Sequence, residues 1–242
     1  SLVKVANELM QAKRLKEARP YIDKALEFYP NDAHVLTTAG LLAMHEKRPK
    51  DARALLEKAN ELEPNLGPAR LNLAAQLLHD GEYERAEKLF ESLVQARPNE
   101  VNFVRGYLDA RLARFKHEYE QNPNSKEALK GLGMTYAHVA KFEPESVPEA
   151  TRLLRKYLQL DKEDVEARYY LGGALLLGNY LDQAIEELEA ARGLVEDSNP
   201  MAKEISATLS VARARRMSYE RAKKQRKKAG PMPKQSVNNS PK

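Results

Sequence analysis

The sequence of 242 residues contains no cysteine and no tryptophan. Without cysteine the chain has no disulfide, no thiolate nucleophile and no cysteine zinc site, although this leaves the compartment open. No run approaches the 18 apolar residues that a transmembrane helix needs, so we expect a soluble chain with no membrane-spanning segment. The chain starts at Ser1 without methionine, which is compatible with a removed N-terminal signal or anchor. We therefore leave its localisation unknown.

The usual catalytic patterns are also missing. The sequence has no G-x-S-x-G, no phosphate-binding P-loop pattern and no H-E-x-x-H. Its 35 acidic residues will form many incidental pairs on helix surfaces, so paired carboxylates alone do not indicate catalysis. We therefore expect a protein that is not an enzyme and that needs no cofactor.

Charge is distributed unevenly along the chain. Residues 213–242 contain 11 Lys and Arg against the single Glu220, whereas residues 1–212 contain 29 basic and 34 acidic residues. The two parts therefore have opposite net charge. Such asymmetry bears on partners and solubility rather than on the fold.

The first two hundred residues repeat with a step of 34. Alanines recur at Ala18, Ala52 and Ala86, and prolines recur with the same step after each of them. A small residue recurs one helix earlier, as Ala6, Gly40 and Ala74. Two antiparallel helices approach closely only where small residues replace large ones, so each unit is predicted to be a pair of short helices.

At these positions the sequence resembles the tetratricopeptide repeat family. The match is carried by Gly40, Ala52, Ala59 and Pro64 in one unit and by "GEYERAEKLF" with Pro98 in the next. It resumes around two further sets of residues, namely Gly133, Tyr136, Ala150, and Gly172, Ala184, Ala191. Five units cover most of residues 1–198. The resemblance implies an all-α fold, an α-solenoid in which antiparallel helix pairs form a right-handed superhelix with an inner groove of first helices.

Two segments depart from the repeat. Between Gly133 and Gly172 the step is 39, which predicts a longer loop at about 141–148. Between Ala74 and Gly133 the step is 59, and the apolar spacing over 101–123 predicts one long irregular helix, with a degenerate helix pair as the alternative. A lone helix would break the pairwise stacking, and its apolar face offers a contact for a homo-oligomer.

The chain ends in a different pattern. Ser198 or Asn199 is the expected N-cap of a helix over 199–228, in which Pro200 takes the first position. Its apolar stripe is predicted to cap the last repeat, as repeat arrays require for solubility. Pro, Asn, Ser and Lys dominate residues 229–242, which predicts a disordered tail.

Three histidines fall at the same position of successive first helices. His45, His79 and His138 each follow the small residue of their helix by five. One metal ion needs ligand nitrogens about 2.0–2.1 Å away, whereas packed helices lie roughly 8–10 Å apart, so we expect no metal site. A polar ring near helix ends and a contact to a partner remain as interpretations.

The family geometry suggests inward-facing residues on the first helices. A carboxylate clamp of the kind found in chaperone-binding relatives is not expected, because Val3, Thr38 and Pro68 occupy its positions. Apolar and amide contacts to an extended or helical segment fit better, although packing between repeats is an alternative for each residue. The candidates are Thr38, Leu41, His45, Asn72, Ala75, His79, Lys130, Met134, His138, Tyr169, Tyr170 and Gly173.

The basic cluster points all around its helix, so it has no apolar face for bilayer insertion. It comprises Arg213, Arg215, Arg216, Arg221, Lys223, Lys224, Arg226, Lys227 and Lys228. A solvated extension or intramolecular partner of the acidic array, a contact for an acidic protein, and a targeting signal all remain open. Weak electrostatic contact with nucleic acid or anionic lipid is also compatible.

The sequence as a whole predicts an interaction scaffold. Its groove is expected to bind a peptide segment or helix of another protein, with the basic extension as an auxiliary contact. The alternative is an adaptor whose basic C-terminal helix binds nucleic acid or an anionic membrane surface.

Overall fold

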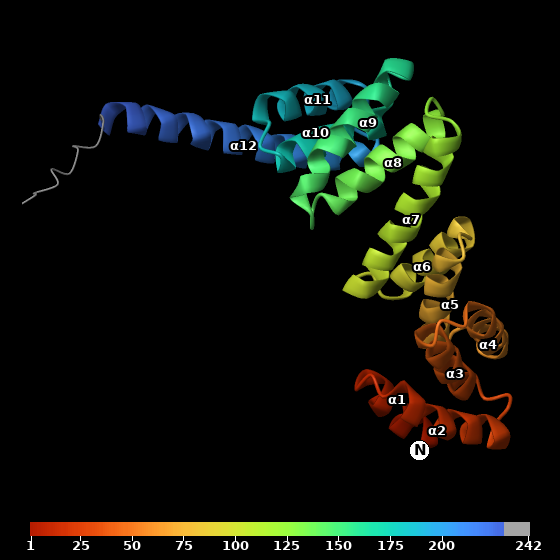
Figure 1. Cartoon of the computed structure of the whole chain (residues 1–242). Helices are drawn as coiled ribbons and strands as arrows, with labels where there is room; N and C mark the ends of the chain where they lie inside the picture. Colours follow the sequence, from red (N-terminus) through yellow and green to blue (C-terminus); the bar gives the residue numbers. More distant parts are fainter. Residues whose placement is uncertain (230–242) are drawn as a thin grey trace, which may run out of the picture. The chain divides into compact units, whose positions relative to one another are not determined.

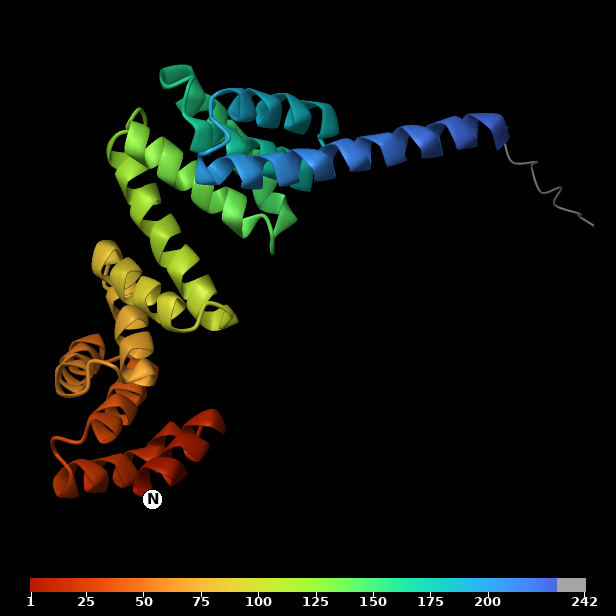
Figure 2. The same ribbon diagram turned by 180° about the vertical axis from the view of Figure 1, so that it is seen from behind.

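The computed structural model describes residues 1–229, with side chains described for residues 1–225. Over this range the chain folds into twelve α-helices and one 3-10 helix, which confirms the predicted all-α solenoid (Figures 1 and 2). Two compact units divide at Ala128 and Leu129, and each is described by itself. The predicted disordered tail, apart from Ala229, lies outside the described residues.

The first unit consists of three helix pairs followed by one longer helix (Figure 1). The pairs are α1 (Leu2–Gln11) with α2 (Leu15–Phe28), α3 (Ala33–His45) with α4 (Pro49–Leu62), and α5 (Gly67–His79) with α6 (Tyr83–Ala96). The small residues of the repeat lie at the contacts, because Ala6, Ala18, Ala52, Ala74 and Ala86 are fully buried. The small side chain at these points lets the two backbones of each pair approach closely.

A left-handed residue ends the turn inside each of these pairs. Lys13, Lys47 and Gly81 have φ between 58° and 82° and follow one another with the 34-residue step. The amide of the next residue bonds back into the first helix, for example from Arg14 N to Leu9 O at 2.8 Å. The turn therefore reverses the chain within three residues.

Helix α7 (Val101–Gln121) is a single helix over the segment where the repeat step is irregular. It packs along α6, and Phe103 and Ala110 join the core formed by α5 and α6. A Cβ on Gly106 would lie 2.2 Å from Cε1 of Phe90, so the two helices touch through a glycine. The role of α7 in this unit is therefore to cover the apolar face of the third pair.

The second unit begins in α8 (Lys126–Val139) and continues with the 3-10 turn Pro144–Ser146, α9 (Val147–Leu160), α10 (Val165–Leu177), α11 (Leu181–Gly193) and α12 (Pro200–Ala229). The 3-10 turn occupies the predicted insertion. Asp164 caps α10 by accepting a hydrogen bond from Ala167 N at 2.9 Å. Helices α10 and α11 pair as α3 and α4 do.

Helix α12 packs on α11 and then continues beyond it (Figures 1 and 2). Asn199 accepts a hydrogen bond from Met201 N at 2.9 Å, as an N-cap does. Ala202, Ile205, Leu209 and Ala212 are buried along one side. From Arg213 to Gln225 every side chain is exposed. The first half of α12 is thus the cap, and the second half is a solvated helix.

Candidate functional site

The first unit contains a cavity of about 580 Å³ between α1 and α3. The first helices provide Asn7 and Gln11 from α1 and Leu41 and His45 from α3, and Met10, Lys13 and Leu15 complete the lining. Asn7 and Leu41 occupy the same repeat position, one residue after Ala6 and Gly40, and Gln11 and His45 both lie five residues after them. Stacking of successive repeats therefore places these side chains side by side.

The cavity has an apolar floor and a polar rim. Met10 is 6% exposed and belongs to the core of this unit, against which Leu15 and Leu41 pack. The rim consists of two amides, the ammonium group of Lys13 and the imidazole of His45, which is exposed. Amide groups can both donate to and accept from a peptide backbone, while the floor can receive an apolar side chain. The arrangement suits a short polypeptide segment.

The other predicted groove residues of this unit lie outside the cavity. Thr38 is 6% exposed, and its hydroxyl donates to the carbonyl of His34 in its own helix at 3.0 Å. Asn72 and Ala75 are half-buried on α5, and His79 is exposed beside Asp80. Leu41 and His45 are therefore the two members of the predicted set that line this cavity. Counting 34 residues back from Leu41 and His45 gives Asn7 and Gln11, so the repeat step could have predicted these two residues as well.

Predicted groove residues of the second unit form an aromatic and polar surface on α8 and α10. The Nε2 atom of His138 lies 3.0 Å from the hydroxyl of Tyr170, and the rings of Tyr169 and Tyr170 pack edge to face. Gly173 is half-buried, with open space where a side chain would be, whereas Met134 is 7% exposed. The tyrosines offer flat apolar area with a polar end, which is common in binding surfaces.

Lys130 is held by carboxylates of α10. Its ammonium group contacts Asp164 at 2.8 Å and Glu166 at 2.9 Å, and the hydroxyl of Tyr157 donates to Asp164 at 2.7 Å. Burial alone would lower the pKa of Lys130, but hydrogen bonds to the two carboxylates raise it. Burial would likewise raise the pKa of Asp164, yet hydrogen bonds from Lys130, Ala167 N and Tyr157 lower it. This cluster joins α8 to α10.

The basic cluster on α12 divides into two parts. Arg213 pairs with Glu189 at 2.7 Å, and Arg216 pairs with Asp182 at 2.5 Å, both on α11. Arg215, Arg221, Lys223 and Lys224 are exposed. The side chains of Arg226, Lys227 and Lys228 lie outside the described ones. Arg213 and Arg216 therefore add ion pairs to the contact between α12 and α11.

Over residues 1–229 no three His, Asp or Glu side chains gather closely enough to hold a metal ion. No helix in that range is both long and apolar enough to cross a membrane.

Comparison with protein families gives two models, both described as tetratricopeptide repeat. One matches residues 43–103, and the other matches residues 5–66 and 144–200. Together these matches span the three N-terminal helix pairs and the segment from α9 through α11.

Solved structures to which the chain is similar include the following three. YrrB, described as a TPR protein with an unusual peptide-binding site, is 21% identical, with 81% of this chain and 86% of that chain covered and a TM-score of 0.35. A tetratricopeptide repeat protein from Parabacteroides merdae is 14% identical, with coverages of 87% and 82% and a TM-score of 0.43. The Pseudomonas aeruginosa protein pilF is 15% identical, with coverages of 87% and 86% and a TM-score of 0.38. None of the curated proteins compared matches the chain.

Proposed function

Because the chain belongs to the tetratricopeptide repeat family, we propose that it is a non-enzymatic scaffold that holds a segment of a partner protein on its first helices. Repeats of this family generally serve protein interaction. The observation that supports the finer proposal is the cavity between α1 and α3, with its apolar floor and amide rim. We place the anchor side chain of the partner on Met10, Leu15 and Leu41, with Asn7 and Gln11 bonding to its backbone.

The tyrosine surface of the second unit is the second contact of this proposal. Tyr169 and Tyr170 are half-buried, and their packed rings cost little conformational entropy when a ligand covers them. Lys130 is engaged by two carboxylates, so its role here is to position α10 rather than to bind a partner. Self-association through α7 remains a prediction, with its exposed Val101 as the apolar contact.

A display library of random twelve-residue peptides, selected on the full chain, tests the cavity. Selected peptides should contain an apolar anchor, and the double variant Asn7→Ala/Gln11→Ala should weaken them by about tenfold, since each lost hydrogen bond contributes about 0.5–1.5 kcal/mol. Neither the Asn7 amide nor the Gln11 amide has a hydrogen-bond partner among the described residues, so replacing them removes no hydrogen bond that stabilises the fold. The matched control is Gln95→Ala/Asn99→Ala, which removes the same two groups from exposed positions of the same unit. Equal loss in both variants would reject the cavity.

The second candidate function is an adaptor whose α12 binds nucleic acid or an anionic membrane. It is favoured by the exposed cations Arg215, Arg221, Lys223 and Lys224, the last three of which lie beyond the turns that pair with α11. Binding of an oligonucleotide should then weaken with salt, with a log-log slope of about −0.7 to −0.9 for each neutralised phosphate. A chain ending at Ala212 should lose this binding completely.

A further inference from the structure

A network of ion pairs, here called the lattice, connects the second helices α4 and α6 of the first unit. Arg53 of α4 pairs with Glu82, which precedes α6, and with Glu57 at 3.2 Å. Arg85 of α6 pairs with Glu82 at 2.6 Å and with Glu57 at 3.3 Å. The four side chains thus satisfy one another across the boundary between two repeats.

The same four repeat positions in the second unit have different residues. Arg53 and Glu57 lie one and five residues after Ala52, and the equivalent residues after Ala150 of α9 are Thr151 and Arg155. Glu82 and Arg85 lie four and one residues before Ala86, and the equivalents before Ala184 of α11 are Tyr180 and Gln183. Both acids and both arginines of the lattice are therefore replaced, and an arginine stands where Glu57 would be.

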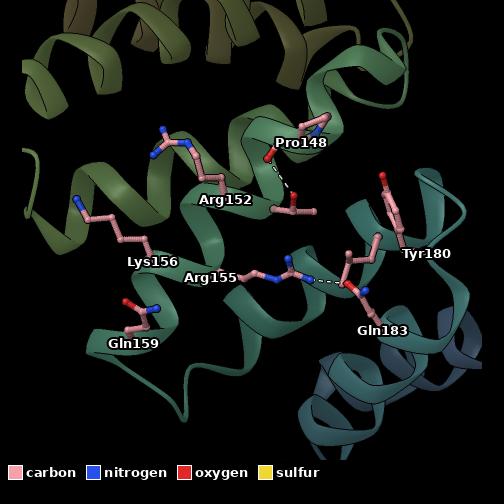
Figure 3. Close-up of a pocket in the computed structure, with 9 residues that line it drawn as sticks. Pro148, Arg152, Arg155, Lys156, Gln159, Tyr180 and Gln183 are labelled. Atoms are coloured by element: carbon pink, nitrogen blue, oxygen red, sulfur yellow. Dashed lines mark hydrogen bonds between the residues drawn. The ribbon is translucent and has the colours of Figure 1, made fainter.

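The replacement leaves a cavity of about 730 Å³ between α9 and α11, shown in Figure 3. Arg155 reaches across it and donates to Oε1 of Gln183 at 2.5 Å (Figure 3). Within the described residues no carboxylate pairs with this guanidinium. Pro148, Leu175 and Tyr180 contribute apolar walls. The hydroxyl of Thr151 donates to Pro148 O at 2.9 Å, so it does not extend the lattice.

The charge around this cavity is positive. Arg152 and Lys156 of α9 also line it, with Arg152 paired to Glu149 along the helix. Three of the four carboxylates of the neighbouring α11 are engaged elsewhere: Asp182 with Arg216, Glu187 with Arg168, and Glu189 with Arg213. The fourth, Glu186, is exposed. The described lining of the cavity itself contains three cations and no carboxylate.

We propose that the cavity between α9 and α11 is a docking site for an acidic segment of a partner protein, whose carboxylate takes the place of the missing lattice acid at Arg155. A guanidinium presents two parallel N–H donors that match a carboxylate, and Gln183 is a neutral partner that a carboxylate displaces without leaving a buried charge unpaired. Tyr180, which is 53% exposed, together with Leu175, accommodates an apolar residue beside the acid. The proposal rests on the scaffold function but not on the α1–α3 cavity.

The experiment uses two peptide pools on the immobilised full chain. Each pool has twelve residues, with four fixed glutamates in one and four fixed glutamines in the other, and the remaining positions vary among Ala, Ser, Leu and Phe. The glutamate pool should be retained about tenfold better, and Arg155→Glu should reduce its retention by about tenfold. Lys203→Glu makes the same charge change at an exposed site of α12 and should reduce it less than twofold.

A second variant rebuilds the lattice of the first unit in the second. Thr151→Arg/Arg155→Glu/Tyr180→Glu/Gln183→Arg should keep its helical circular dichroism and lose the glutamate pool. Asn7→Ala/Gln11→Ala should leave retention unchanged, which separates failure of this site from failure of the proposed groove. The proposal is overturned if the glutamate pool is not retained, or if Arg155→Glu and Lys203→Glu behave alike. An oligonucleotide that requires Arg155 while the glutamate pool is ignored would also overturn it.

Discussion

At the scale of single residues, the fold depends on positions where the backbone takes an uncommon conformation. The turns inside the helix pairs use Lys13, Lys47, Gly81 and Asn179 in the left-handed region. A side chain there brings Cβ close to the following carbonyl oxygen, at a cost of about 1–2 kcal/mol. Two lysines carry this cost, which indicates that the packing of each pair determines the turn rather than the reverse.

Gly81→Ala tests the turn. Because Gly81 has φ of 82°, an alanine should lower the free energy of unfolding by about 1–2 kcal/mol, as measured by urea denaturation followed by circular dichroism. Gly67→Ala is the control, since a Cβ at Gly67 meets nothing within 4 Å. If the two variants have the same stability, the turn conformation is not as described.

Asp164 gives the second unit a dependence on pH. Its pKa is depressed in the folded state, so its contribution is complete above the ordinary carboxyl pKa of about 4 and is lost as the pH falls through the folded-state value. Asp164→Asn should therefore lower stability at pH 7 by about 1–2 kcal/mol and reduce the further loss on acidification. Denaturation curves between pH 7 and pH 2 measure this, with exposed Glu163→Gln as the control. A steeper acid dependence in the Asp164 variant would contradict the assignment.

At the scale of elements, the contact between α6 and α7 depends on one glycine. Gly106→Ala should lower the free energy of unfolding by about 1–3 kcal/mol, because the new methyl group would overlap the ring of Phe90. Helix propensity alone predicts the opposite sign, about 0.8–1.0 kcal/mol of stabilisation. Gly173→Ala in α10 meets open space and should show that stabilisation. Thermal unfolding of both variants decides between packing and propensity.

The cap provides a second test among the elements. Ile205 and Leu209 are buried against the last repeat and contribute on the order of 1.5–3 kcal/mol each. A chain ending at Asn199 should therefore unfold at lower temperature and aggregate, whereas a chain ending at Met217 should keep its melting temperature. Equal melting temperatures for both truncated chains would show that α12 is not a cap.

The sequence predicted helix pairs well because their contacts repeat. Alanines and glycines recurring at a fixed step indicate helix contacts without further information, and these positions are buried in the structure. Gly106 could not be predicted in this way, because the packing of α7 on α6 is not part of the repeat and so no period indicates it. The left-handed conformation of the two lysines could not be predicted either, because lysine is not a residue type that indicates such a turn.

At the scale of the whole molecule, the candidate sites were less predictable than the fold. Leu41 and His45 were among the groove residues suggested by the family resemblance, but the cavity is also lined by Asn7 and Gln11 of the first repeat, where no groove residue was predicted. The role of Lys130 depends on Asp164 and Glu166, which lie more than 30 residues away in the sequence. A binding surface formed by several repeats depends on how the repeats stack. The sequence of a single repeat determines only the packing of its own helix pair.

Affinity capture tests the central claim most directly. The full chain, the variant Asn7→Ala/Gln11→Ala and a chain ending at Ala212 are compared on nuclease-treated lysate of the source cells at low and high salt. The scaffold account predicts that the full and shortened chains retain the same salt-resistant protein and that the double variant loses it. Capture that requires residues 213–242 and is released by salt would contradict the account and support the basic helix as the functional site.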